Sequence, residues 1–479
     1  MGRRRRKKII PNVEITGIAP EGKGFARLDG KVIFVESAVP GDTVEVLVEK
    51  NKKDYAKGRI SQIEKPSNLR VEPFCEHFGT CGGCKWQFLE YEQQLQFKQQ
   101  IVEDALRRTG KLYDLCEIAP ILPSLESRYY RNKMDFSFTN SRWLTEEEVE
   151  SEIEITDRNA LGFHVPKMFN RVVDIKECFL MDDFHNEIRN TVRDFTHEHD
   201  MPFYDYSERK GLMRNLIIRS STLGEWMVIL SFGEENPIKR EGLLTHLEEK
   251  FPQLTSLNYV INEKGNDTIS DLEIINWSGR DHIYENLEEL KFKISPKSFF
   301  QTNPKQAVRL YNIIREFADL KGAETVYDLY TGTGSIAQFL ARYCKKVIGV
   351  EEIADAITDA IDNAKANNLN NCEFVVGDVK NEFTPSFVEQ YGQADLLVTD
   401  PPRAGLHGDV VVNILEINPP RIIYVSCNPV TQARDLNMLS ENYEIKKVQP
   451  VDMFPHTWHV ENVVLLERKE INSNSDEEE

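Results

Sequence analysis

The chain of 479 residues has no apolar run close to the about 18 residues that a membrane-spanning helix needs. No apolar segment of signal-peptide length follows the basic residues near its start, so a secretory signal is not expected. It also has no convincing internal repeat, which argues against a solenoid or a propeller. We therefore expect a cytoplasmic protein without a membrane partner, and nothing in the sequence indicates an obligatory protein partner.

The chain lacks an overall positive charge, because its formal net charge is −19 at pH 7. Positive charge is concentrated in residues 1–66, which hold 15 Lys+Arg against 9 Asp+Glu and leave −25 for the remainder. A basic module on an acidic body is compatible with RNA binding through a local patch. Arg3 to Lys8 form a run of six basic residues, which is either a solvated tail or a tether to phosphate.

The eight cysteines are not expected to form disulfides, because no secretory signal is present. Cys75, Cys81 and Cys84 form a compact C-x5-C-x2-C cluster, and Cys178 is the leading candidate for a fourth ligand. Four thiolates suit either zinc or an iron–sulfur cluster, although the spacing is not the paired C-x2-C of a zinc ribbon. Three other cysteines have ordinary surroundings and are expected to pack in the core: Cys116, Cys344 and Cys372.

Residues 9–66 are predicted to form short strands joined by turns. Val44, Val46 and Val48 alternate with polar residues, and Pro40-Gly41-Asp42 is a turn before them. Several short strands within about 60 residues fit a small barrel of the oligonucleotide-binding type. Any small β-barrel would give this pattern, but four basic residues are expected near one rim: Lys52, Lys53, Lys57 and Arg59.

The remaining chain is predicted to form two further domains and a tail. Residues 67–285 are a mixed α+β region, with a helix over 90–108 and an acidic surface insertion near 147–154. Residues 286–470 alternate strand and helix, which predicts a doubly wound, Rossmann-like sheet. Residues 471–479 are predicted to be a disordered acidic tail. The fold class is therefore multidomain α/β with an N-terminal β-barrel.

A nucleotide-type cofactor site is predicted at the start of the doubly wound region. Val326 to Gly334 read as a strand that enters a G-x-G turn before a helix. Glu351 ends the next strand and is placed to accept hydrogen bonds from ribose hydroxyls, while Asp378 could reach the adenine edge. The glycine turn alone would also suit a dehydrogenase. Asp400-Pro401-Pro402 after the fourth strand is typical of S-adenosylmethionine enzymes that act on planar nitrogen or carbon atoms.

Cys427 and Glu461 are the candidate catalytic pair. Cys427 follows an apolar strand, at the end that lines the ligand crevice of a doubly wound sheet. Methylation of uracil at C5 needs a thiolate that adds to C6, and afterwards a base that removes the proton from C5. Glu461 begins the last strand, beside the same crevice, and is the candidate base.

Together these motifs resemble the RNA uracil-C5 methyltransferase family, over about residues 9–470. The likeness is to the subgroup with a TRAM domain and a [4Fe–4S] cluster, which includes the 23S ribosomal RNA enzymes. It implies that Cys75, Cys81, Cys84 and Cys178 hold an iron–sulfur cluster, which we expect to be structural. It also implies that Cys427 is the nucleophile and Glu461 the base.

The resemblance also implies contacts to S-adenosyl-L-methionine and to RNA. Residues at the cofactor site by this likeness are Gln301, in Ser298-Phe299-Phe300-Gln301, and Tyr330, Ser335, Glu351, Asp378 and Asp400. The family often has Asn where this chain has Ser335 and Asp378. RNA contact is expected at Arg131-Asn132-Lys133 and Gly162-Phe163, whereas the acidic insertion has no assigned role.

Three alternatives remain open. The same chemistry could act on the tRNA T-loop, although the TRAM domain and the cluster favour 23S rRNA. A radical enzyme with a TRAM module would need C-x3-C-x2-C on a partial barrel, which this chain lacks. A non-catalytic RNA-binding or redox-sensing module would leave Cys427 and Glu461 without a purpose.

Overall fold

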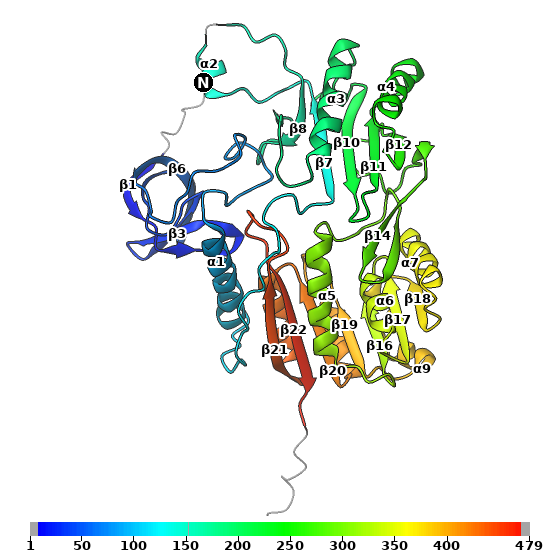
Figure 1. Ribbon diagram of the computed structural model, residues 1–479. Helices are drawn as coiled ribbons and strands as arrows, with labels where there is room; N and C mark the ends of the chain where they lie inside the picture. The colour runs from blue at the N-terminus through cyan, green and yellow to red at the C-terminus, as the bar shows by residue number, and fades with distance from the viewer. Residues whose placement is uncertain (1–7, 152, 471–479) are drawn as a thin grey trace, which may run out of the picture.

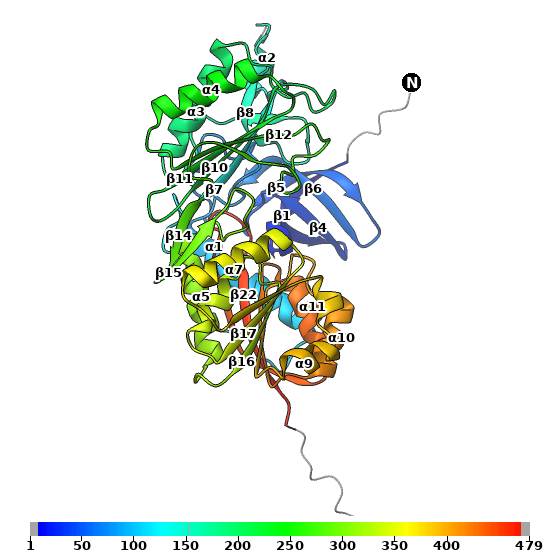
Figure 2. The ribbon, with the colours of Figure 1, turned by 90° about the vertical axis from the view of Figure 1, so that its right-hand side faces the viewer.

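The protein, described by a computed structural model over residues 8–151 and 153–470, consists of a small barrel and two larger lobes (Figure 1). The barrel lies beside the junction of the two lobes in both views (Figure 2). Among the described residues, no helix has both the length and the apolar character to cross a bilayer. The predicted acidic tail and all of the basic run except Lys8 lie outside the described residues.

The N-terminal barrel is a curled six-stranded sheet in the order β1-β5-β6-β4-β3-β2. Its strands are β1 (Ile9–Glu14), β2 (Gly17–Ile18), β3 (Gly24–Leu28), β4 (Lys31–Glu36), β5 (Thr43–Asn51) and β6 (Tyr55–Lys65), with a short helix η1 (Pro20–Gly22) between β2 and β3. Val44, Val46 and Val48 point into its core, as their alternation with polar residues predicts.

Asp42 connects the barrel to the chain that follows it. Its side chain is fully buried in the predicted turn and accepts hydrogen bonds from the N–H groups of Val39 (2.7 Å) and Ser67 (2.9 Å). The guanidinium of Arg70 donates two more, at 2.7 and 2.8 Å. A buried carboxylate needs such partners, so this aspartate fixes the exit of the barrel.

The central lobe is a seven-stranded sheet in the order β13-β12-β11-β10-β7-β8-β9. Its strands are β7 (Lys133–Thr139), β8 (Ala160–His164), β9 (Val172–Asp174), β10 (Met213–Ser220), β11 (Trp226–Phe232), β12 (Ser256–Ile261) and β13 (Ile275–Gly279). Apolar side chains of α3 (Phe184–Glu198) and α4 (Pro237–Lys250) pack with those of the sheet. The acidic insertion forms the short helix α2 (Glu146–Glu150), which begins at a capping box between Thr145 and Glu148.

The C-terminal lobe is a seven-stranded sheet in the order β18-β17-β16-β19-β20-β22-β21. Its strands are β16 (Thr325–Leu329), β17 (Lys346–Glu351), β18 (Cys372–Val376), β19 (Leu396–Thr399), β20 (Arg421–Ser426), β21 (Tyr443–Val451) and β22 (Glu461–Arg468). Its helices are α5 (Pro304–Ala318), α6 (Ser335–Ala341), α7 (Ala354–Ala366), α8 (Val379–Glu382), α9 (Pro385–Tyr391), α10 (Gly408–Ile417) and α11 (Pro429–Leu439). The hairpin of β14 (Ile283–Leu287) and β15 (Leu290–Ile294) precedes it.

One strand distinguishes this sheet from that of a dinucleotide-binding dehydrogenase. The dehydrogenase order is 3-2-1-4-5-6 with parallel strands. Here β22 is inserted between β20 and β21 and runs antiparallel to both. The doubly wound sheet predicted for residues 286–470 is present, with this antiparallel strand added.

Helix α1 (Tyr91–Asp104) and its extension η2 (Ala105–Thr109) pack on the C-terminal lobe, although the central sheet follows them in the chain. Ile101 and Val102 are buried in the same cluster as Leu436 of α11 and Val464 of β22. The division of the chain at residues 66 and 285 remains a prediction, since this helix crosses between the lobes.

The loop between β21 and β22 joins helix α1 to the C-terminal sheet through buried polar contacts. At its start the carboxylate of Asp452 accepts hydrogen bonds from Lys98 Nζ (2.6 Å) and the Tyr91 hydroxyl (2.8 Å), both from α1. The side chains of Lys98 and Asp452 are both fully buried. Further along, Gln94 of α1 accepts the N–H of His456 at 2.8 Å. The loop therefore cannot move without breaking buried polar contacts.

We expect Lys98→Met to lower the free energy of unfolding by about 3–5 kcal/mol, because it leaves Asp452 as an unpaired buried charge. Urea unfolding would measure the change. Lys321→Met, which breaks the exposed pair with Asp319, is the control and should change stability little. Replacing both buried partners, as Lys98→Met with Asp452→Leu, should recover much of the loss. A Lys98→Met protein as stable as wild type would contradict this account.

Candidate active site and cysteine cluster

The predicted active-site residues follow the ends of neighbouring strands, so they lie along one edge of the C-terminal sheet. Asp400 follows β19 and Cys427 follows β20. Glu461 is the first residue of β22, and because β22 is antiparallel its beginning lies at the same edge, where Ser426 pairs with Asn462. The fold thus brings the proposed nucleophile and the proposed base together from positions 34 residues apart in sequence.

The glycine turn after β16 is shaped by backbone that few residues adopt. Gly332 and Gly334 have positive φ angles of 56° and 75°, and so does Tyr330, at 65°. A non-glycine residue in this region is strained, and such strain is concentrated at functional sites. The Glu351 carboxylate accepts hydrogen bonds from the N–H groups of Gly332 and Ile353, both at 3.1 Å, so it braces the turn.

The other predicted cofactor residues have more varied settings. Ser335 begins α6, and its hydroxyl lies 2.9 Å from that of Tyr311. Asp378 is exposed and caps α8 by accepting the N–H of Lys380 at 3.0 Å, near Tyr330. Gln301 is half-buried in the loop before α5.

Three buried carboxyl groups lie along this edge of the sheet, and little positive charge lies near them to balance their negative charge. Burial raises the pKa of Asp328 to about 7, although the Thr331 hydroxyl donates a hydrogen bond to it at 2.6 Å. Burial and then the charge of Asp328 raise the pKa of Asp400. Burial and then Asp400 raise the pKa of Glu461, whose side chain is nearly inaccessible. A carboxylate with a raised pKa is a better proton acceptor, which suits a general base.

The Cys427 thiol experiences the same negative surroundings. Burial raises its pKa to about 11, and Glu461 and Asp400 add to this, whereas Arg403 opposes it. The loop that carries Arg403 is held against Cys427, because the Arg403 carbonyl accepts hydrogen bonds from Asn428 Nδ2 (3.0 Å) and the Thr431 hydroxyl (3.2 Å). At neutral pH the free protein therefore holds a thiol, and forming the reactive thiolate requires more positive charge nearby.

Two residues of the candidate site were not predicted from the sequence. Tyr311, the hydroxyl partner of Ser335, lies on α5 and carries no motif that would reveal it. Arg403 stands in the Asp-Pro-Pro-Arg motif, where its spacing from Asp400 could have indicated a role beside the thiol.

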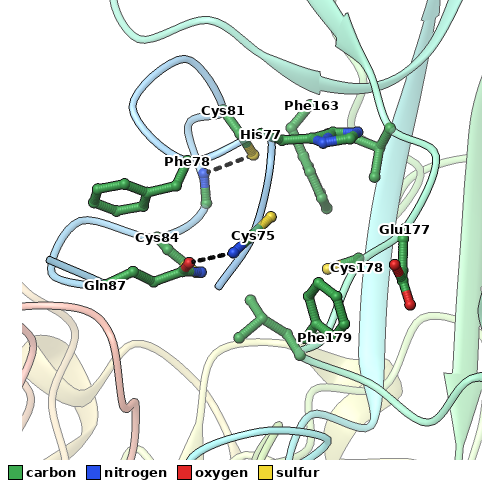
Figure 3. A pocket seen from close by; sticks show the side chains of 13 residues that line it. Cys75, His77, Phe78, Cys81, Cys84, Gln87, Phe163, Glu177, Cys178 and Phe179 are labelled. Atoms are coloured by element: carbon green, nitrogen blue, oxygen red, sulfur yellow. Dashed lines mark hydrogen bonds between the residues drawn. The ribbon is translucent and has the colours of Figure 1, made fainter. Parts of the chain in front are cut away.

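The four clustered cysteines line one cavity (Figure 3). Cys75, Cys81 and Cys84 come from the loop before α1, and Cys178 comes from the segment after β9. The rest of the lining is mainly aromatic and apolar, including Phe78, Phe163, Ile175, Phe179 and Leu180. Burial raises the pKa of both Cys81 and Cys84 to about 12, so as thiolates they would need a strong positive partner.

The described residues contain no group of three or more His, Cys, Asp or Glu side chains arranged to hold a metal ion. Around a single zinc ion, with Zn–S of about 2.3 Å, four sulfur atoms would nearly touch one another. In this protein the four cysteines surround an apolar cavity. Four thiols are a donor set that suits zinc and an iron–sulfur cluster alike.

The cysteine loop also contacts the loop before Glu461. The N–H groups of Lys85 and Trp86 both donate to the carbonyl of His456, at 2.7 and 3.0 Å. Phe74, next to Cys75, packs edge-on against the His456 ring. The cavity and the edge of the sheet that carries the candidate active site are thus joined by one short segment.

Comparisons with known proteins identify the family and the N-terminal domain. The profile of a family described as tRNA (Uracil-5-)-methyltransferase matches residues 273–469, and that of the TRAM domain matches residues 10–61. A Bacteroides thetaiotaomicron protein named uncharacterized RNA methyltransferase is 51% identical over 453 residues, 94% of this chain and 100% of its own. One of the same name from Porphyromonas gingivalis is 50% identical over 95% of this chain and 99% of its own.

A solved structure extends the likeness to nearly the whole chain. It is the crystal structure of Pyrococcus abyssi tRNA (uracil-54, C5)-methyltransferase in complex with S-adenosyl-L-homocysteine. That protein is 29% identical, with a TM-score of 0.72 over 95% of this chain and 100% of its own.

The fold is that of an S-adenosylmethionine-dependent methyltransferase with an N-terminal TRAM domain. The chain belongs to the RNA (uracil-5-)-methyltransferase family. This confirms the predicted family, TRAM domain and C-terminal fold. The 23S rRNA subgroup and the iron–sulfur cluster remain predictions.

We expect Glu461→Gln to lower the pKa of Cys427, because it removes a negative charge beside the thiol. Iodoacetamide alkylation of Cys427, followed by mass spectrometry of its peptide, should increase with pH in wild type and begin to increase at lower pH in the variant. Glu467→Gln, near the far end of β22, is the control and should leave the profile unchanged. An unchanged or upward-shifted profile in Glu461→Gln would show that the two groups do not interact.

Proposed function

We propose that this protein methylates C5 of a uridine in RNA, with Cys427 as the nucleophile and Glu461 as the base. The observation that carries the proposal is that the Cys427 thiol and the Glu461 carboxyl group, both buried and both with a raised pKa, lie together at the ligand-binding edge of a methyltransferase sheet.

Uracil C5 is a poor nucleophile, so it has to be activated before it can attack a methyl group. The Cys427 thiolate adds to C6, which breaks the C5–C6 double bond and places negative charge on C5 and the O4 enolate. S-adenosyl-L-methionine supplies the methyl group to C5. Glu461 then takes the proton from C5, the double bond re-forms, and the C6–S bond breaks to release Cys427.

The pKa shifts at this site favour the later step, proton removal by Glu461, over the earlier step, thiolate formation at Cys427. The raised pKa of Glu461 favours proton abstraction, whereas the raised pKa of Cys427 disfavours thiolate formation. Arg403 is the described cation that acts on both groups. We infer that Arg403, together with the positive sulfonium of the cofactor, stabilises the thiolate once the site is filled.

We propose that the cofactor lies over the glycine turn. Glu351 would bind its ribose hydroxyls and Asp400 would face the reacting end. The remaining contacts proposed for S-adenosyl-L-methionine are Gln301, Tyr330, Ser335 and Asp378.

We propose 23S rRNA as the substrate, with the TRAM domain (residues 9–66) and the central domain (67–285) flanking the catalytic domain (286–470). Uridine in tRNA is the second candidate, since the Pyrococcus abyssi neighbour is named as a tRNA (uracil-54, C5)-methyltransferase. RNA contact at Arg131-Asn132-Lys133 is consistent with both, because that segment lies between the two lobes.

We further propose that Cys75, Cys81, Cys84 and Cys178 hold a [4Fe–4S] cluster. Support comes from an apolar cavity that is lined by four cysteine thiols, the donor set that such a cluster takes. No step of the methyl transfer needs an electron. The residues around the cluster would therefore serve to fix the cysteine loop against His456 and the central sheet.

Methyl transfer from labelled S-adenosylmethionine to unmodified 23S rRNA and unmodified tRNA in parallel tests the function. We expect 5-methyluridine in 23S rRNA alone, identified by nuclease digestion and mass spectrometry, and none with Cys427→Ala. Label in tRNA would support the mechanism but would show that tRNA is the substrate in place of 23S rRNA. If neither RNA gains 5-methyluridine, or if Cys427→Ala remains active, the proposal is wrong and a non-catalytic RNA-binding role is favoured.

Protein purified without oxygen should contain iron and sulfide in equal amounts, and Cys178→Ala should lose most of both. Cys116→Ala, which alters a half-buried cysteine outside the cavity, should retain them. If the wild-type protein contains zinc and no sulfide, the four cysteines hold a metal ion and the proposed cluster is wrong.

A further inference from the structure

The loop that carries Gln301 is held at its beginning by two side chains, Arg219 and Asp359. Arg219 of β10 donates from its guanidinium to the backbone carbonyls of Ser295 (2.9 Å) and Ser298. Asp359 of α7 accepts hydrogen bonds from the hydroxyls of the same two serines. The turn is closed on itself, because the Ser298 N–H donates to the Ser295 carbonyl at 3.1 Å and the Ser295 N–H to the Ser298 hydroxyl at 3.0 Å.

The other end of the same loop is held by Asn132. Its backbone N–H donates to the carbonyl of Thr302 at 2.9 Å, and its side-chain amide donates to the carbonyl of Gln301 at 3.3 Å. Between the two attachments Phe299 is largely exposed, with 68% of its surface accessible, while Phe300 is buried. The backbone of Gln301 is thus fixed although its segment has no regular secondary structure.

The three side chains that hold this loop come from two lobes. Arg219 and Asn132 belong to the central lobe, whereas Asp359 lies on α7, the helix that follows Glu351. Arg219 is 4% exposed and burial lowers its pKa, yet Asp135 lies close enough to counter this. A buried guanidinium is retained where its planar fork bridges fixed acceptors, which an ammonium group cannot do in the same way.

We propose that Arg219 is a positioning residue for the cofactor: it sets the place of Gln301 relative to Glu351 and so makes cofactor affinity depend on the central lobe. The inference rests on the proposed function, in which Gln301 and Glu351 contact S-adenosyl-L-methionine. Arg219 itself touches neither the cofactor nor the uridine in this scheme. It acts through the backbone of residues 295–298.

The test is the affinity of the full-length protein for S-adenosyl-L-homocysteine, measured by titration calorimetry. We expect Arg219→Lys to weaken binding about tenfold, as the loss of one charged hydrogen bond would. The KM for S-adenosylmethionine should increase by a similar factor, while kcat at saturating cofactor should change much less. A purely structural role would lower thermal stability and leave both the dissociation constant and the KM unchanged.

Arg214 provides a matched control on the same strand. It is 1% exposed and its guanidinium donates to the carbonyls of Asn262 (2.6 Å), Lys264 (2.6 Å) and Asn266 (2.7 Å), in a loop that takes no part in the proposed cofactor site. Arg214→Lys should therefore lower stability without changing the affinity for S-adenosyl-L-homocysteine. Equal loss of affinity in both variants would overturn the assignment.

Asp359→Asn loosens the same turn from the partly exposed side and keeps the proposal testable if Arg219→Lys does not fold. It should also weaken S-adenosyl-L-homocysteine binding, by a smaller factor. Wild-type affinity in the folded variants would overturn the positioning role alone. Failure of the wild-type protein to bind S-adenosyl-L-homocysteine at all would instead count against the proposed function.

Discussion

Lys98 and Asp452 are both removed from water, and each has the other as its charged partner. Such a pair gives little net stability, but breaking it is costly, so it fixes geometry more than it adds free energy. It joins α1 to the loop that ends at Glu461, and the same loop receives the cysteine segment at His456 and the central lobe at Pro455, whose carbonyl accepts the Tyr130 hydroxyl at 3.1 Å. The position of the proposed base thus depends on three distant parts of the chain: α1, the cysteine segment and the central lobe.

The edge that carries the candidate active site gathers several carboxyl groups with little positive charge to balance them. Burial raises the pKa of all three carboxyl groups; Asp328 adds to the shift at Asp400 and Asp400 to that at Glu461. Glu461 and Asp400 also raise the pKa of Cys427. A site of this kind binds a cation readily, and the sulfonium of S-adenosylmethionine is one. Cofactor affinity and thiolate formation would then be linked through the same charges. Because burial and Asp400 raise the pKa of Glu461 to about 8, its basic form is lost as the pH falls through that value. If Glu461 is the base, activity should be lost over the same range.

Much of this could be predicted from sequence, because strand ends and short motifs are local signals. The alternation in β5, the strand before Cys427 and the Asp-Pro-Pro-Arg segment all indicated their structures directly. The edge strand β21 was missed, because lysines, Pro450 and a register shift interrupt its apolar pattern. Two contacts join residues far apart in the chain: Lys98 pairs with Asp452, and Arg219 donates to the carbonyl of Ser295. No local sequence pattern predicts such contacts. The packing of α1 on the C-terminal lobe escaped prediction for the same reason.

The most direct test of the central claim is covalent capture on RNA that contains 5-fluorouridine. Fluorine at C5 cannot be removed as a proton, so the methylated adduct should remain attached to the protein. The account predicts a complex that survives denaturation, carries one added methyl group and is linked through Cys427, as peptide mass spectrometry would show. Methylation of normal RNA without any such complex, or attachment through a different cysteine, would contradict it.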